Sequence, residues 1–198
     1  MQPFRTHTGT ALPLDRSDVD TDQIVPAEYL KRIERTGYGP FLFAEWRKDP
    51  AFVLNDPRYE GATVLLAGAN FGSGSSREHA VWALEDHGFR VVIAPSFADI
   101  FRTNCTKVGL LPVQLPATTV RALMDAVLAA PATALTVDLG TSTVAGAGVG
   151  ASFEIDEFTK WRLLEGLDDI GLTLRHADAV AAYEATRPSW LPATAPSA

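Results

Sequence analysis

Short apolar runs alternate with amphipathic stretches through the middle of the chain, and this alternation is its strongest pattern. Three apolar runs rich in aliphatic side chains predict strands, at 62–67, 91–94 and 110–115. The stretches that follow them predict helices, at 76–87, 98–108 and 118–130. In the last of these, one helical face carries the apolar side chains Val120, Leu123, Met124, Val127 and Leu128. Strand followed by helix, three times in succession, predicts an α/β fold with a mainly parallel sheet core and helices packed on it.

The two ends of the chain show weaker patterns. There the sequence predicts, in order, irregular or strand-like chain at 1–30, a short helix at 28–35, a packed aromatic excursion at 37–57, hairpin strands at 136–153, and helices at 158–167 and 177–186. We expect one domain over residues 1–187. A proline- and alanine-rich tail without fixed structure is expected at 188–198.

The composition limits location and partners. The chain has 198 residues with 17 basic and 24 acidic side chains, so its formal net charge is −7. We expect no nucleic-acid partner, because an acidic chain without a basic stripe repels phosphate backbones. No stretch approaches the roughly 18 apolar residues of a membrane span, and the N-terminus does not resemble a signal peptide. A cytoplasmic protein that does not bind membranes is therefore expected.

Cys105 is the one cysteine in the sequence. A single thiol forms no internal disulfide, and it cannot by itself hold an iron–sulfur cluster or a zinc ion, which take several thiolates. The four histidines show no spacing typical of metal ligands. We therefore expect no metal and no cofactor to be bound by this chain alone, and a buried structural role for Cys105.

Two motifs that suggest ligand binding fail a closer comparison. A calcium loop that starts at Asp18 requires glycine at position 23 and glutamate at position 29, where the chain has Gln23 and Tyr29. The acidic cluster there has two interpretations, a polar turn whose carboxylates cap nearby amides, or an active-site role for Asp22. The glycines at 146–150 lack the third glycine of a dinucleotide fingerprint and predict a hairpin.

The segment 70–79 is the best candidate for a ligand site. It follows an apolar strand and opens a helix, the position at which sheet-and-helix proteins bind ligands. Gly72 and Gly74 allow successive backbone amides to face one point, and the helix start directs further amides towards it. The next residues add two hydroxyls and a guanidinium, from Ser75, Ser76 and Arg77. These features predict an anion site, and the simpler alternative is a serine-capped helix start after a tight glycine turn.

Three blocks in one order resemble a known family. They are Asp-Thr-Asp-Gln-Ile-Val-Pro-Ala at 20–27, Asn-Phe-Gly-Ser-Gly-Ser-Ser-Arg-Glu-His-Ala at 70–80, and the segment 89–113. The chain resembles the swivelling domain of aconitase-like hydro-lyases and, within that family, the small subunits of 3-isopropylmalate dehydratases. The resemblance covers the chain to about Arg187, and it implies an aconitase-like swivelling β/β/α domain.

This resemblance also implies an activity and a partner. The family removes water from a 2-hydroxy dicarboxylate and adds it back with the hydroxyl on the neighbouring carbon. Here the implied reaction interconverts 2- and 3-isopropylmalate through isopropylmaleate, a step of leucine biosynthesis. In the family a [4Fe–4S] cluster supplies Lewis-acid help. Because one cysteine cannot hold such a cluster, the resemblance implies a larger, cysteine-rich subunit that carries it.

The family's motif assigns roles to particular residues of this chain. Ser75 matches the base, which acts as an alkoxide. Arg77 matches the clamp on a substrate carboxylate, and Ser76 matches its neighbouring hydrogen-bond donor. Thr21 and Asp22 match a segment near the active site, in which Asp22 is expected to orient a catalytic group.

Substrate specificity is expected in residues 29–37. The family places a further substrate-binding arginine there, and the spacing leaves both Arg32 and Arg35 open, with a slight preference for Arg35. Three apolar side chains in this segment either meet an isopropyl group or pack against the core, namely Tyr29, Leu30 and Ile33.

Some alternatives remain open from sequence. Glu78 and His79 are expected to orient the loop, with direct contact to substrate as the alternative. The same chemistry on homoaconitate or on a methylated malate fits the motifs too. A protein of another class, a free-standing anion-binding module without a catalytic partner, would share the loop at 70–79.

Overall fold

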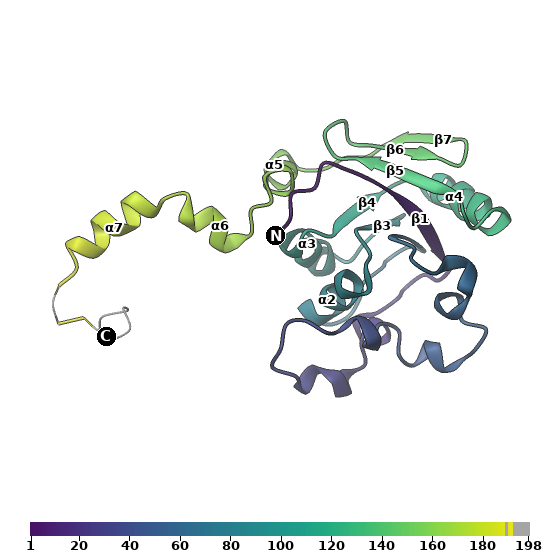
Figure 1. The fold of residues 1–198 in the computed structure, drawn as a ribbon, viewed down its shortest axis with the longest axis horizontal. Helices are drawn as coiled ribbons and strands as arrows, with labels where there is room; N and C mark the ends of the chain where they lie inside the picture. The colour runs from purple at the N-terminus through teal and green to yellow at the C-terminus, as the bar shows by residue number, and fades with distance from the viewer. Residues whose placement is uncertain (189, 192–198) are drawn as a thin grey trace.

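The computed structural model describes residues 1–188, 190 and 191, and its strands form a seven-stranded sheet in the order β4-β3-β2-β1-β5-β6-β7 (Figure 1). The strands β1 to β7 span Thr6–Leu14, Val64–Ala67, Val91–Ala94, Leu111–Gln114, Ala134–Asp138, Thr143–Gly146 and Val149–Ser152. The long strand β1 joins two halves of the sheet. Its first half pairs antiparallel with β5, and its second half pairs parallel with β2.

The parallel half, β1 to β4, confirms the sheet core predicted from the sequence. Strands β2 and β3 are buried along their whole length, as expected for parallel strands covered on both faces. Helices α2 (Glu78–His87) and α3 (Asp99–Val108) pack against each other on one side, while α4 (Ala117–Ala129) contacts β1, β2, β3 and β7 (Figure 1). The antiparallel half, β5 to β7, confirms the hairpin strands predicted near residues 136–153.

Helix α4 buries four of the five apolar side chains predicted for its inner face. The prediction is wrong for Leu128, whose side chain is 46% exposed. At 100° per residue, Leu128 lies about 80° around the helix from Val120, at the margin of the apolar stripe. The last turn of α4 therefore presents this leucine to solvent.

Two predicted helices have different boundaries in the structure. The helix expected at 28–35 is a short 3-10 helix, η1 (Ala27–Lys31), and Arg32 after it has an extended backbone. The helix expected at 76–87 begins two residues later, because Arg77 has an extended backbone with φ −113°. The amide of Arg77 donates to the carbonyl of Ser75 at 2.8 Å, which turns the chain before the helix starts.

The aromatic segment between η1 and β2 is a packed excursion, as predicted. It consists of short 3-10 helices, η2 (Gly39–Phe41), η3 (Trp46–Lys48), η4 (Val53–Asn55) and η5 (Pro57–Tyr59). Its aromatic rings hold it to the core, since Tyr38 and Phe43 are fully buried and Phe43 stacks on Trp46 with 5.3 Å between ring centroids.

After the sheet the chain continues as three helices. Two of them were predicted within two residues, α5 (Glu157–Glu165) and α7 (Ala177–Ala185), and α6 (Asp169–Leu174) was not. The tail predicted at 188–198 lies outside the described residues, except at 188, 190 and 191. None of the helices in the described part of the chain is long and apolar enough to cross a membrane.

Candidate active site

Three loops meet where the parallel strands β1, β2 and β3 end. They are the loops 15–20, 68–77 and 95–98. Single bridges between backbone segments link them, Asp20 with Ser73 and Phe71 with Phe97. The glycine–serine segment therefore lies at the carboxyl edge of the sheet, where proteins of this architecture bind ligands.

Backbone hydrogen bonds connect the first two loops. The carbonyl of Val19 accepts from the amides of Gly72 at 2.8 Å and Ser73 at 3.2 Å, and the amide of Thr21 donates to the carbonyl of Ser73 at 2.9 Å. The Thr21 side chain is 2% exposed, and its hydroxyl donates to the carbonyl of Ser75 at 3.2 Å. A buried hydroxyl with a good partner restrains the group that it binds. Thr21 thus fixes the backbone of Ser75.

The third loop supports the start of the glycine–serine segment. Asn70 has a positive φ of 56°, and its amide donates to the hydroxyl of Ser96 at 2.8 Å. The side-chain amide of Asn70 donates to the Asp18 carboxylate at 2.8 Å. The sequence did not predict this role of Ser96, although Ser96 lies in the third block of the resemblance.

The aspartates of the acidic cluster at 18–22 differ in what they contact. Asp20 caps helix α1 (Thr21–Ile24): its carboxylate accepts from the amide of Gln23 at 2.8 Å, while the Gln23 side chain accepts from the amide of Asp20 at 3.0 Å. Asp22 lies in the first turn of α1 and pairs with Arg77 instead. Asp20 is therefore a turn carboxylate, whereas Asp22 pairs with Arg77, and its active-site role stays a prediction.

Arg77 is the positive group of the site. Its Nη1 donates to Oδ1 of Asp22, and the Arg77 side chain is 22% exposed whereas that of Asp22 is 54% exposed. Arg77 is also the N-cap residue of α2, next to the unpaired amides and the positive dipole end of that helix. The carboxylate orients the guanidinium fork, and the N–H groups that do not face Asp22 can bind a second anion.

The expected nest of amides is smaller than the sequence predicted. Gly72 has a positive φ of 79°, but its amide is bound to the Val19 carbonyl and is not free for an anion. Among the described residues, no hydrogen bond is found from the amides of Gly74, Ser75 and Ser76 or from the two serine hydroxyls. Both serines are exposed. The candidate anion-binding surface therefore starts at Gly74, whose φ of 91° turns the chain towards α2.

His79 lies beneath this surface, in the first turn of α2. Its ring lies tilted against that of Trp82 at a centroid distance of 4.7 Å, and edge-on to that of Tyr38 at 5.3 Å. Burial lowers the pKa of His79 below its ordinary 6.5, the nearby Arg77 lowers it further, and Glu78 opposes both. Within the described residues the buried Nδ1 of His79 and the hydroxyl of Tyr38 have no hydrogen-bond partner. The loop-orienting role expected for His79 stays a prediction.

Both candidate arginines of the 29–37 segment lie over this aromatic group. The Arg32 guanidinium is 5.6 Å from the centre of the Tyr38 ring, and it also lies 3.6 Å from the Glu34 carboxylate. The Arg35 guanidinium is 5.8 Å from the Trp82 ring. Because the rings of Tyr38 and Trp82 both contact that of His79, each arginine is linked to helix α2 through an aromatic ring. The geometry does not separate the two candidates.

The apolar side chains of the same segment differ in their surroundings. Tyr29 stacks on Phe41 with 4.2 Å between centroids, and Leu30 packs partly against the core. Ile33 is 96% exposed, so the alternative of core packing is wrong for this residue. Ile33 lies two residues beyond the end of η1.

Metal-binding groups are not gathered in the part of the chain that the structure describes. In residues 1–188, 190 and 191, no group of three or more His, Cys, Asp or Glu side chains is arranged to hold a metal ion. Cys105 is fully buried in α3, as expected, and burial raises the pKa of its thiol. The described side chains of this chain therefore do not fit an iron–sulfur cluster.

The two glycines of the loop give a matched test of its packing. A Cβ at Gly72 would lie 2.1 Å from the Phe101 ring, whereas at Gly74 the nearest atom would be 3.5 Å away. We expect Gly72→Ala to lower the free energy of unfolding by at least about 2 kcal/mol, from left-handed backbone strain plus overpacking. Gly74→Ala should lower it by about 1 kcal/mol, from the strain alone. Urea unfolding of the isolated chain measures both, and equal losses would contradict the packing argument.

Comparison with known proteins gives family matches in two parts of the chain. Residues 1–118 match the family described as the aconitase C-terminal domain. Residues 169–197 match the family described as the C-terminal domain of the 3-isopropylmalate dehydratase small subunit. The first match covers all three loops of the site, and the second begins at the first residue of α6.

Curated relatives match along almost the whole chain. A protein of Parafrankia sp. (strain EAN1pec) is 65% identical over 195 residues, which are 98% of this chain and 100% of the relative. A protein of Acidothermus cellulolyticus is 64% identical over 194 residues, 98% of each chain. Both are named 3-isopropylmalate dehydratase small subunit. A crystal structure of 3-isopropylmalate dehydratase from Methanocaldococcus jannaschii matches with a TM-score of 0.65 and 26% identity, over 90% of this chain and 99% of that chain, which confirms the predicted fold.

Proposed function

The chain belongs to the family of 3-isopropylmalate dehydratase small subunits, and we propose that it is the substrate-gripping half of a two-subunit hydro-lyase. The reaction interconverts 2-isopropylmalate and 3-isopropylmalate by dehydration to isopropylmaleate and rehydration, a step of leucine biosynthesis. The observation that carries the proposal is the ion pair of Arg77 with Asp22, held beside the exposed Ser75 at the carboxyl edge of the sheet.

Substrate binding follows from the charges of the loop. A carboxylate that approaches the exposed surface accepts hydrogen bonds from the free amides of Gly74 to Ser76 and from the Arg77 guanidinium. Asp22 keeps the guanidinium from rotating away, so part of the cost of orientation is met before the substrate arrives. Ser76 offers its hydroxyl to the same carboxylate.

Proton transfer is assigned to Ser75. In water a serine hydroxyl is a weak base and nucleophile, so this role needs concentrated positive potential. The N-terminus of α2 and the Arg77 guanidinium supply that potential, and Thr21 fixes the Ser75 backbone from below. Ser75 removes a proton from the carbon beside a substrate carboxylate during dehydration, and the same hydroxyl returns it during rehydration.

The rest of the site is assigned to a partner. Because the described side chains do not fit a [4Fe–4S] cluster, we place the cluster in a larger, cysteine-rich subunit, where it supplies Lewis-acid help to the departing hydroxide. The small-subunit name of the relatives supports such a partner. We further propose that the complex is cytoplasmic, and that residues 1–187 form its swivelling domain.

Reconstitution tests this function. The purified chain is mixed anaerobically with the cluster-loaded large subunit of the same organism, and hydration of isopropylmaleate is followed by the loss of ultraviolet absorbance of its conjugated double bond. We expect activity from the mixture and none from either subunit alone. The value of kcat/KM should exceed that for methylmaleate by at least about tenfold, because two further methylenes are buried.

The control replaces this chain with the small subunit of the Parafrankia relative. If the relative supports hydration and this chain does not, the proposed function is wrong. If the mixture hydrates methylmaleate or homoaconitate with the higher kcat/KM, the reaction class stands and the substrate changes.

A further inference from the structure

The end of the described chain projects from the body as a C-terminal arm, which we define as α6 and α7, residues 169–187 (Figure 1). Every residue from 173 to 186 is exposed, and α7 contains no buried side chain. Large apolar side chains nevertheless occur along the arm, with exposed fractions of 71% for Ile170, 65% for Leu174, 41% for Val180 and 70% for Tyr183. Such side chains on one projecting element mark a contact surface.

The helical form of the arm indicates that its apolar side chains pack against another protein surface. Helix α6 has six residues and α7 has nine. Isolated helices shorter than about 12 residues are marginal in water, and most helices in proteins are stabilised by packing of an apolar face. Among the described residues, α7 has no such packing on the body. A partner that buries the apolar side chains supplies the missing stabilisation.

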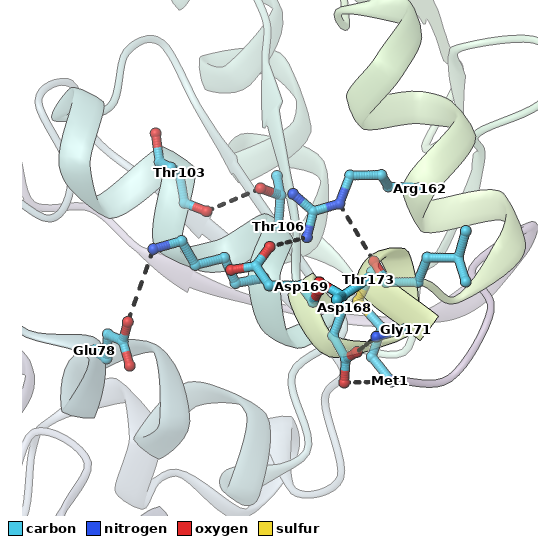
Figure 2. Close-up of polar contacts among 11 residues, drawn as sticks. Met1, Glu78, Thr103, Thr106, Arg162, Asp168, Asp169, Gly171 and Thr173 are labelled. Atoms are coloured by element: carbon cyan, nitrogen blue, oxygen red, sulfur yellow. Dashed lines mark hydrogen bonds and ion pairs between the residues drawn. The ribbon is translucent and has the colours of Figure 1, made fainter. Parts of the chain in front are cut away.

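The base of the arm, by contrast, is fixed to the body (Figure 2). Nη2 of Arg162 on α5 lies 2.8 Å from the Asp169 carboxylate, and Nε of Arg162 donates to the carbonyl of Leu167 at 3.3 Å. Asp168 caps α6, since its carboxylate accepts from the amide of Gly171 at 2.7 Å. The direction in which the arm leaves the body is therefore set by the chain itself.

Helix α3 lies between the base of the arm and the start of helix α2 in the candidate active site. Thr106 and Arg162 line one depression of about 400 Å³ between α3 and α5. Lys107 follows Thr106 on α3, and its Nζ lies 3.8 Å from the carboxylate of Glu78, the first residue of α2 (Figure 2). Helix α3 thus contacts the start of α2 on one side and lines a depression with the base of the arm on the other.

The comparisons tie the arm to small subunits. The match to the aconitase C-terminal domain ends at residue 118, and the match specific to the small subunit begins at 169, where the arm begins. The name of the first family describes a domain of a longer chain. A domain that stands as a separate subunit has lost the high effective concentration of such a covalent link, and additional contact area is one way to replace it.

We propose that the C-terminal arm is the docking element for the large subunit, which receives its apolar side chains in a groove. This inference rests on the proposed function, because it requires the partner named there. The spacing fits recognition of a helix in a groove, with Ile170 and Leu174 four residues apart on α6, and Val180 and Tyr183 three apart on α7. In this arrangement the loop at 72–79 contacts the substrate, and the arm provides affinity for the large subunit.

Two double variants test the arm with a matched control. Ile170→Ser with Leu174→Ser alters α6, and Val180→Ser with Tyr183→Ser alters α7. Leu128→Ser is the control, because Leu128 is also exposed but lies on α4. Titration of each variant with the cluster-loaded large subunit should give a Kd at least about tenfold higher for both arm variants and unchanged for the control. At saturating large subunit, kcat should equal that of the wild type.

Thermal unfolding and analytical ultracentrifugation of the isolated chains accompany the titration. Unchanged folding of the arm variants is expected, since the altered residues are exposed. A wild-type Kd for both arm variants would overturn the proposal, and so would a lower kcat at saturation. Loss of self-association with unchanged affinity for the large subunit would assign the arm to a second copy of this chain. Failure of the wild-type pair to hydrate isopropylmaleate would instead count against the proposed function.

Discussion

Replacing Ser75 with alanine is expected to lower kcat of the reconstituted enzyme by about 10³-fold, the typical contribution of a positioned proton-transfer group. Ser75 is exposed, and we propose that the start of α2 and the Arg77 guanidinium favour its ionised form, while Thr21 holds its backbone. Alanine removes the hydroxyl and leaves these groups in place. Steady-state hydration of isopropylmaleate at saturating large subunit measures the loss.

The neighbouring Ser76→Ala is the control. Ser76 is also exposed and lies one residue closer to α2, and it is assigned one hydrogen bond to substrate. Loss of a single such bond should lower kcat/KM by about tenfold or less. Both variants should unfold like the wild type and bind the large subunit with the same Kd. Full activity of Ser75→Ala, or an equal loss in both variants, would contradict the assignment of the base.

The parallel half of the fold could be predicted because its signal is local. Strands β2 and β3 are buried on both faces, so each is an unbroken apolar run in the sequence. Strand β1 was expected only as irregular or strand-like chain. Its first half is partly exposed and its second half is buried, because the two halves pair with different strands. The strand as a whole is therefore neither an unbroken apolar run nor a regular apolar–polar alternation.

Helix α6 of the C-terminal arm could not be predicted in the same way, whereas α7 was predicted from its sequence. Periodicity identifies a helix by the stripe that faces the core, and α6 has no buried residue. What specifies α6 locally is its cap, in which the Asp168 side chain binds the amide of Gly171. A cap without an apolar stripe is a weak signal, although it is the signal expected of a helix that packs against another chain.

The site was predicted in part, since the loop and its anion-binding groups are contiguous in the sequence. The ion pair is different, because Asp22 and Arg77 are 55 residues apart. Which carboxylate reaches Arg77 depends on where α1 begins: Asp20 is its cap, and Asp22 lies in its first turn. The amide of Gly72 is bound within the protein for a similar reason, since its partner Val19 comes from the loop after β1.

Arg77→Ala is expected to lower kcat/KM for isopropylmaleate by about 10³-fold. The guanidinium is assigned two charge-assisted hydrogen bonds to a substrate carboxylate, and each is worth about 1.5–3 kcal/mol. Arg77→Lys keeps the charge without the planar fork and should lose about 10²-fold. Arg58→Lys is the matched control, because Arg58 also pairs with a carboxylate, that of Asp56, but on η5. That variant should retain wild-type kinetics.

Asp22→Asn tests whether Asp22 positions the Arg77 guanidinium or takes part in the reaction directly. If Asp22 acts by holding the guanidinium, the single variant should lower kcat/KM by about tenfold, and adding it to Arg77→Ala should change the rate less than twofold. If Asp22 contacts the reacting groups independently of Arg77, the losses of the two single variants should multiply to about 10⁴-fold in the double variant. The structure favours the first result, because the Asp22 carboxylate already receives an N–H of Arg77 while half of its surface faces solvent. Multiplying losses would move Asp22 from positioning Arg77 to direct participation in the reaction.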